Sequence, residues 1–198
     1  MDENTQNWRK FYEKALSRPH SKRTELAIKL NQSGVNVAVD CGCGTGSDID
    51  YLEQQRYQVY GFDVNPDSIK ICRDRFKTKP LVDITKSSFE LYDYPHSGVV
   101  IANSSLFFAD PTHFNRAWEK VEKSIEIGGV FAGDFMGVKD SWASNFRQPT
   151  TPLSEQQVRA LFVNFEIIRF IERDEISETT IGILKHWHTY SVVAVKRA

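Results

Sequence analysis

The stretch Val37–Asp63, VAVDCGCGTGSDIDYLEQQRYQVYGFD, decides the fold of this chain. It begins with a short apolar run that ends at Asp40, continues through three glycines at alternate positions, and shows helical spacing from Ser47. A second apolar run, residues 59–62, ends at Asp63. The order strand, glycine loop, helix, strand predicts a βαβ unit with a ligand-binding loop at its first turn.

The glycine loop consists of Gly42, Gly44 and Gly46, which leave room for a ligand against the main chain. Its spacing differs from the G-x-G-x-x-G of dinucleotide loops, and Asp40 before it disfavours a phosphate and favours a cation. Asp63, at the end of the next strand, can accept both hydroxyls of a ribose. The two carboxylates therefore favour a cationic nucleoside without phosphate, S-adenosylmethionine, over an ordinary tight turn of another Rossmann-like protein.

These residues resemble two motifs of the class I S-adenosylmethionine-dependent methyltransferases. The segment Asp40–Gly46 matches the family's first motif in full, and Asp63 matches its second-strand acid. The resemblance implies an α/β fold, with a Rossmann-like, seven-stranded, mostly parallel sheet, helices on both faces and an antiparallel last strand. Size and a similar ending most resemble the small bacterial branch that contains tellurite-resistance and thiopurine-type methyltransferases.

The chain has 198 residues, which predicts a single domain, with a helical cap at 1–33 and a Rossmann-like core at 34–198. A net charge of -1 gives no basic footprint for nucleic acid. Apolar runs are shorter than a membrane span and the first residues are polar, so we expect a cytoplasmic protein without a membrane partner. The three cysteines, Cys41, Cys43 and Cys72, are interpreted as reduced and structural, and we expect no metal.

Two helices are expected before the glycine loop, because apolar residues recur at helical spacing on both sides of Pro19. They either cover the sheet or form a cap over the ligand. In the cap alternative, Arg18 is the first candidate to bind the cofactor's carboxylate, since a guanidinium can bind a carboxylate through two parallel hydrogen bonds. Tyr12 and His20 are further candidates to reach the cofactor or the substrate.

Other cofactor-binding candidates follow the predicted strands. Val64 comes directly after Asp63, and the resemblance places Ser88 and Phe89 beside the adenine, with Ser88 where the family usually has an acid. Asn103 and Ser104 follow the buried run 98–102, and ligands of open α/β sheets sit beyond such strand ends. A strand-end cap without ligand contact is the alternative for Asn103. The sequence here lacks the Asp/Asn-Pro-Pro-aromatic motif of resembling enzymes that methylate the amino groups of DNA bases.

Later segments predict the remaining elements. A helix is expected from Asp110 to the Gly128–Gly129 pair, followed by a fifth strand at 130–135. The irregular segment 136–151, which contains Trp142, is a candidate wall of the substrate pocket. A capping box at Ser154 starts another helix, and strands are expected at 165–172 and 186–196.

The predicted reaction is methyl transfer to a small-molecule acceptor by in-line displacement, in which the protein mainly aligns the reactants and excludes water. A hydroxyl acceptor needs a general base, for which His20, Asp134, His186 and Asp110 are the available groups. A soft sulfur, selenium or tellurium nucleophile needs none. His186 shares a strand face with His188, which leaves metal binding, strand packing and a substrate role open. Alternative functions are an RNA or protein methyltransferase and a non-catalytic S-adenosylmethionine-binding domain.

Overall fold

The computed structural model describes residues 12, 14–146 and 148–198. The strands in this part of the chain are β1 (Val37–Cys41), β2 (Gln58–Asp63), β3 (Val82–Lys86), β4 (Ser97–Ala102), β5 (Ile125–Gly137), β6 (Pro152–Leu153), β7 (Phe165–Glu178) and β8 (Leu184–Lys196). The α-helices are α2 (Lys22–Leu30), α3 (Ser47–Gln54), α4 (Pro66–Phe76), α5 (Phe114–Ser124), α6 (Trp142–Asn145) and α7 (Glu155–Ala160).

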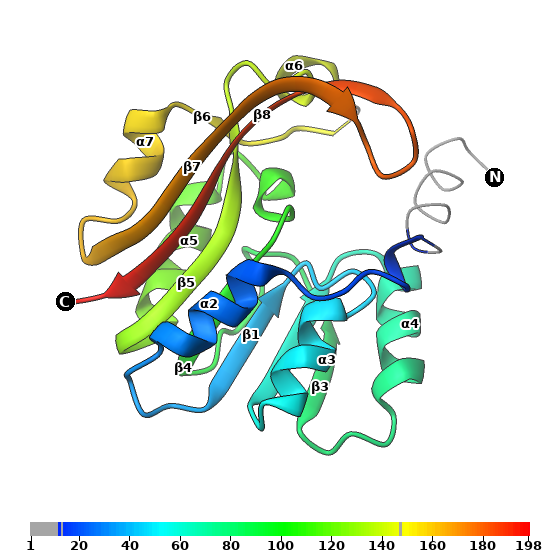
Figure 1. Cartoon of the computed structure of the whole chain (residues 1–198), viewed down its shortest axis with the longest axis vertical. Coiled ribbons are helices and arrows are strands. Elements are labelled where there is room, and N and C mark those ends of the chain that lie inside the picture. Colours follow the sequence, from blue (N-terminus) through cyan, green and yellow to red (C-terminus); the bar gives the residue numbers. More distant parts are fainter. Residues whose placement is uncertain (1–11, 13, 147) are drawn as a thin grey trace.

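The strands form one sheet in the order β3-β2-β1-β4-β5-β8-β7, with the short β6 paired to β5 (Figure 1). All described strand pairs are parallel except those of β8, which runs antiparallel to β5 and β7. This confirms the predicted Rossmann-like sheet with an antiparallel last strand. The strand order reverses between β1 and β4, and open α/β sheets bind ligands at such a point.

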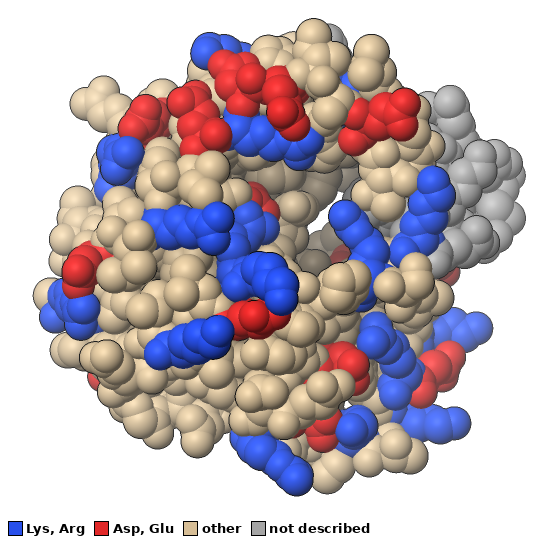
Figure 2. All heavy atoms as spheres, viewed as in Figure 1, with Lys and Arg blue, Asp and Glu red and all other residues tan. Residues whose placement is uncertain are grey.

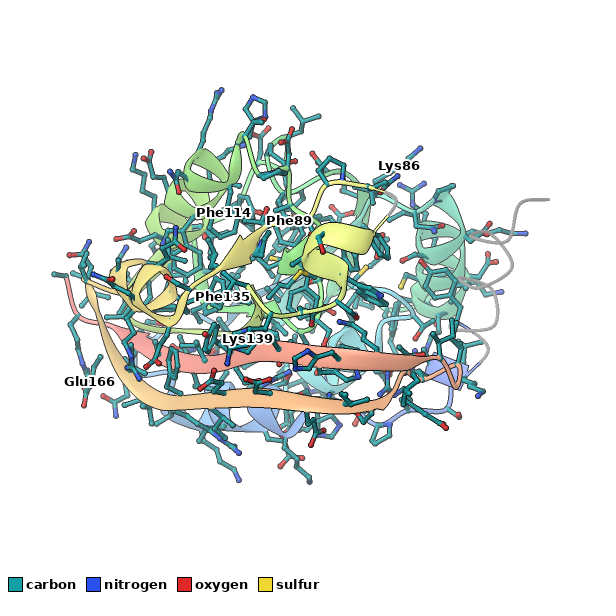
Figure 3. The ribbon with its side chains drawn as sticks, turned by 90° about the horizontal axis from the view of Figure 1, so that it is seen from above. Lys86, Phe89, Phe114, Phe135, Lys139 and Glu166 are labelled. Atoms are coloured by element: carbon teal, nitrogen blue, oxygen red, sulfur yellow. The ribbon has the colours of Figure 1, made fainter. Side chains whose placement is uncertain are left out.

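Helices cover both faces because the central strands are apolar on both sides. In β4, Val100 and Ala102 join one core with α5 and α7, while Val99 and Ile101 join the other with α2, α3 and α4. Figure 3 shows three aromatic members of the first core, Phe89, Phe114 and Phe135. Alternating residues thus point to opposite layers, as the period of two in a strand requires.

Several predicted boundaries were wrong: β5 covers Ile125–Gly137 rather than 130–135, and β8 begins at Leu184 rather than at 186. The helix before β5 ends at Ser124 rather than at Gly128–Gly129, because Ile125 already pairs with Ser97 in the sheet and its side chain is buried. That helix also begins at Phe114, after a turn in which Asp110 accepts the Thr112 N–H. Strand β7 continues to Glu178, since its polar second half pairs with β8.

Helix α2 packs on the face of the sheet, against β5, β8 and β4. It begins after Ser21, which caps it by accepting the Arg23 N–H, and it buries Thr24 and Ala27. The sheet-covering alternative therefore describes α2, while most of the predicted first helix lies outside the described residues. Among the described residues, no helix is long and apolar enough to cross a membrane. The three cysteines are free and buried, as predicted.

Candidate functional site

The glycine loop at the carboxyl end of β1 is closed on one side and open on the other. All three glycines have positive φ angles of +70°, +54° and +80°. A Cβ on Gly42 would lie 2.5 Å from the Ser105 Cβ, and one on Gly46 would lie 2.5 Å from the Phe76 ring. A Cβ on Gly44 would meet no described atom within 4 Å. The loop is therefore packed onto the protein at Gly42 and Gly46 and open for a ligand at Gly44.

The Asp63 carboxylate faces this open position. Its Oδ2 accepts the Gly44 N–H at 3.0 Å, and its Oδ1 accepts the N–H of Asn65 at 2.9 Å. Asn65 caps α4, so the carboxylate is held between the glycine loop and a helix start. Val64, next in the chain, is 59% exposed and presents an apolar side chain at this edge.

The loop after β3 lies beside Asp63, because the Ser87 N–H donates to the Asp63 carbonyl at 3.1 Å. This contact brings the predicted Ser88 close to the same edge. Phe89 is buried instead, with its ring edge-to-face on Phe62 at 5.4 Å between centroids. The structure thus places Ser88 near the candidate ligand position and the Phe89 side chain in the core.

Asp40 is a buried carboxyl group at the start of the glycine loop, with 4% of the residue exposed. Burial raises its pKa well above the usual value, and the negative groups of Asp48, Cys72 and Asp63 raise it further. A cationic ligand beside the loop would lower the pKa of Asp40, because an opposite charge favours the ionised form of the carboxyl group. The site is therefore electrostatically prepared for a positive group.

Arg23 links the edges of three strands, and sequence reasoning missed it. Its guanidinium forms a two-pronged ion pair with Asp134 of β5, with Nη2 2.6 Å from Oδ2. Its Nε donates to Asn103 Oδ1 at 3.0 Å, and Nη1 donates to Ser191 Oγ of β8 at 2.6 Å. No local pattern marks Arg23, because Asp134 lies 111 positions away in the chain.

The polar residues after β4 are engaged within the protein. Asn103 donates from Nδ2 to Asp48 of α3 at 3.0 Å, besides accepting from Arg23. Ser104 has a positive φ of 52° and donates to Asp134 Oδ2 from both N–H and Oγ, at 2.9 and 3.2 Å. With the donors from Arg23 and Ser191, Asp134 accepts five hydrogen bonds. This carboxylate therefore holds α2, the segment after β4, β5 and β8 together.

A cavity of about 160 Å³ opens next to this cluster. Its lining comes from α2, the segment after β4, and strands β5, β7 and β8: Arg23, Ser104, Phe107, Asp134, Arg173, Trp187, Thr189 and Ser191. Figure 2 shows the molecule hollowed on this face, between the β7–β8 hairpin and the start of α2. The cavity lies at the carboxyl ends of β4 and β5, where a ligand beside the glycine loop could meet a second one.

A buried cation supports the wall of this cavity from behind. Lys185 and Asp140 form an ion pair in which both side chains are almost fully buried. The Lys185 Nζ lies 4.4 Å from the ring centroids of both Trp142 and Trp187, and burial lowers the pKa of this lysine. Trp142, from the predicted wall segment, therefore packs behind Trp187 and outside the cavity lining.

His20 and Arg18 do not line this cavity; the segment that contains them lies beside the start of α3, where the Ser21 N–H donates to Asp48. The His20 ring stacks on Tyr51 at 3.7 Å, and its Nε2 lies 2.8 Å from Glu25 Oε1. The Arg18 side chain is exposed to solvent. Tyr12, in contrast, is buried close enough to Asp63 for the two groups to interact electrostatically, and burial raises its pKa.

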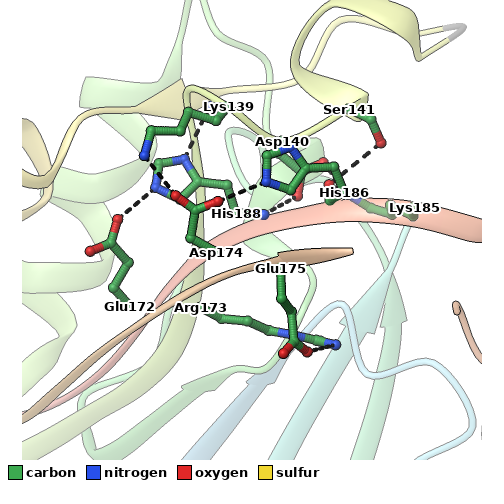
Figure 4. A network of polar contacts seen from close by, with 10 residues as sticks. All are labelled: Lys139, Asp140, Ser141, Glu172, Arg173, Asp174, Glu175, Lys185, His186 and His188. Atoms are coloured by element: carbon green, nitrogen blue, oxygen red, sulfur yellow. Dashed lines mark hydrogen bonds and ion pairs between the residues drawn. The ribbon is translucent and has the colours of Figure 1, made fainter. Parts of the chain in front are cut away.

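The two histidines of β8 occupy a separate polar network, shown in Figure 4. His186 Nε2 pairs with Asp174 at 2.7 Å, outside the cavity lining. His188 Nδ1 accepts the Lys139 N–H at 3.0 Å, so in the neutral ring the proton is on Nε2, 2.8 Å from Glu172. A metal bound at Nε2 would need a lone pair there, so these contacts favour the strand-packing interpretation over a metal site.

Asp110 also serves a structural role. Its carboxylate accepts hydrogen bonds from Thr112, and His113 lies beside it at 3.0 Å. These contacts lower the pKa of Asp110 to about 2. Such a carboxylate is a weak base near neutral pH.

Comparisons with known proteins agree with this geometry. Residues 39–133 match the family model described as "Methyltransferase domain". A search of curated proteins found no match. A methyltransferase from Methanosarcina mazei, described as SAM-dependent, superposes with a TM-score of 0.67 at 15% identity, covering 91% of this chain and 99% of that one.

Two further solved structures share the fold. TehB from Haemophilus influenzae has a TM-score of 0.68 at 15% identity, covering 91% of this chain and 63% of its own. Magnesium protoporphyrin IX methyltransferase from Synechocystis, solved with bound SAM, has a TM-score of 0.62 at 14% identity, covering 88% and 76%. At these identities the likenesses establish the fold. The family match assigns residues 39–133, just under half of the chain, to a methyltransferase domain, and these residues include the DCGCGTG loop and Asp63.

Proposed function

We propose that this chain transfers a methyl group from S-adenosylmethionine to a small-molecule acceptor by in-line displacement. The observation that carries the proposal is the pairing of two sites at one sheet edge. The glycine loop is open at Gly44 beside the Asp63 carboxylate, and the cavity of about 160 Å³ opens at the ends of β4 and β5. One site suits the methyl donor and the other suits the acceptor.

The cofactor residues would act in two groups. The glycine loop and Asp40 would hold the cationic amino-acid part, and Asp63 would accept from the ribose hydroxyls. Val64 and the main chain of Ser88 and Phe89 would flank the adenine. Asn103 and Ser104 would shape the floor near the methyl group. Arg18 remains a candidate for the cofactor's carboxylate.

The sulfonium of the bound cofactor supplies an activated methyl group, so the chain's own residues have to align the acceptor and exclude water. In-line displacement forms the bond between the acceptor atom and the methyl carbon as the carbon–sulfur bond breaks, and its electron pair stays on sulfur. His20 and His186 lie outside the cavity lining, and Asp134, which lines it, accepts five hydrogen bonds within the protein. This favours an acceptor whose nucleophile needs no base, such as a thiolate or a related soft anion.

No described feature favours an RNA or protein acceptor. On the face shown in Figure 2, Lys and Arg are interspersed with Asp and Glu, so this face lacks the single-sign groove that a nucleic-acid substrate would use. The tellurite-resistance branch remains part of the proposal, supported by the shared fold of TehB.

Calorimetry with S-adenosylhomocysteine and a turnover screen with a methyl-labelled donor test the proposal. We expect binding to the wild-type chain and labelling of small thiols or other soft nucleophiles. Binding of NAD in place of S-adenosylhomocysteine would contradict the cofactor assignment. Tight binding without turnover on any acceptor would instead support a non-catalytic domain.

A further inference from the structure

Among the described residues, the cavity wall offers hydrogen-bond donors but no carboxylate without protein partners. Its carboxylate, Asp134, already accepts from Arg23, Ser104 and Ser191. The Arg23–Asp134 pair is therefore neutral as a unit. A second guanidinium, that of Arg173, would add a positive charge to the same wall once a ligand displaces its exposed partner Glu175. This balance favours a ligand that is negatively charged.

Arg173 is placed to exchange its partner for a ligand. Its Nε donates to Glu175 Oε1 at 2.8 Å and its Nη2 donates to Ser177 Oγ at 2.6 Å. Both side chains of the ion pair are substantially exposed, 41% for Arg173 and 57% for Glu175. Exposed pairs of this kind contribute little free energy, so a ligand carboxylate could replace Glu175 at little cost. Figure 4 shows Arg173 and Glu175 pointing away from Asp174, on the other side of β7.

The cavity also has flat apolar walls. The Arg173 guanidinium carbon lies 4.8 Å from the centroid of the Trp187 ring, and Phe107 contributes a second aromatic side chain. The Trp187 Nε1 is buried and has no hydrogen-bond partner among the described residues. Trp187 is supported from behind by Trp142, at 5.9 Å between ring centroids. A rigid aromatic wall beside a guanidinium suits a flat anion.

We propose that the acceptor is a small, flat organic anion whose carboxylate binds Arg173 and whose ring lies against Trp187. This inference rests on the proposed function, because it takes the cavity to be the acceptor site. A cavity of about 160 Å³ has room for a single small ring.

The test uses the full chain and benzoate as the probe, with benzamide as its neutral analogue and acetate as an anion without a ring. Binding is measured by calorimetry in the presence and absence of S-adenosylhomocysteine. The variant is Arg173→Gln, and the matched control is Arg169→Gln, an exposed arginine on the same strand outside the cavity lining. S-adenosylhomocysteine affinity is measured on all three proteins.

We expect benzoate to bind the wild type and the Arg169→Gln control more tightly than benzamide or acetate does. Arg173→Gln should weaken benzoate by about tenfold or more and leave benzamide unchanged. Benzoate binding no tighter than benzamide, including no binding of either, would overturn the inference, as would an equal effect of both substitutions. Failure of the wild type to bind S-adenosylhomocysteine would instead count against the proposed function.

Discussion

Arg23 and Asp134 form a two-pronged ion pair that ties the first turn of α2 to β5 at the edge of the candidate acceptor cavity. The Asp134 side chain is only 6% exposed, and that of Arg23 is 20% exposed. Truncation of the arginine alone leaves a buried carboxylate without its counter-charge. Arg23→Ala should therefore lower the free energy of unfolding by about 3 kcal/mol, as measured by urea denaturation.

The exposed Lys29, at the other end of the same helix, provides the matched control. Lys29→Ala should change the free energy of unfolding by less than about 0.5 kcal/mol. The double variant Arg23→Met/Asp134→Leu should lose less than Arg23→Ala, because it leaves no unpaired charge. A similar loss in the lysine and arginine variants would show that the ion pair is not the cause.

A substitution at Gly44 should have a small effect on stability and a large effect on ligand binding. An alanine there meets no described atom but must adopt a φ of +54°, which costs about 1 kcal/mol. Gly182, in the turn before β8, has a φ of +82° and equally open surroundings, so Gly182→Ala should cost a similar amount. Only Gly44→Ala should also abolish S-adenosylhomocysteine binding in calorimetry, since its methyl group would occupy the ligand's space. Equal affinities for the two variants would place the cofactor elsewhere.

Asp63 should contribute to cofactor affinity through charge-assisted hydrogen bonds. Asp63→Ala should weaken S-adenosylhomocysteine binding by about 10- to 100-fold, because such bonds contribute about 1.5–3 kcal/mol each. Asp74→Ala, an exposed acid on the outer side of α4, is the control and should leave the affinity unchanged. An unchanged dissociation constant for Asp63→Ala would remove this residue from the ribose site.

Cofactor binding should depend on pH through Asp40. In the free protein, burial and the charges of Asp48, Cys72 and Asp63 raise the pKa of Asp40, so it stays protonated to higher pH than an ordinary aspartate. A cationic ligand prefers the ionised form and lowers this pKa, so binding releases a proton. Affinity for S-adenosylmethionine should therefore increase as the pH rises through the pKa of the free protein and level off above it.

Calorimetry in buffers of different ionisation enthalpy measures the released proton. Asp40→Asn cannot ionise and should show neither proton release nor the pH dependence. The same linkage affects stability: the raised pKa means that the folded form loses stability as the pH rises from the unfolded-chain pKa of Asp40 toward the raised value. Proton uptake on S-adenosylmethionine binding would contradict the predicted ionisation of Asp40.

The arrangement of the candidate cofactor site was largely predictable from the sequence. The glycine loop and Asp63 belong to one contiguous βαβ unit, so local spacing alone predicts that they meet. The same is true of the capping box at Ser154, which the structure confirms. The parallel order of the central strands followed from the family resemblance.

The acceptor half could not be predicted in the same way. Arg23, Asp134 and Ser191 come from distant parts of the chain, and only the completed sheet brings them together. Asp134, near the end of a predicted strand, was a candidate base, yet its partners give it a structural role. The end of α5 was misplaced because pairing of Ile125 in the sheet overrides the usual stop signal of a glycine pair.

The insertion of β8 between β5 and β7 also has a consequence for synthesis. Chains emerge from the ribosome with their amino end first. The glycine loop and its βαβ unit are complete once β2 has been made, whereas one edge of β5 has no partner until β8 is released. A nascent chain thus carries an unprotected edge for much of its translation, and truncation near the carboxyl end should favour aggregation of the product.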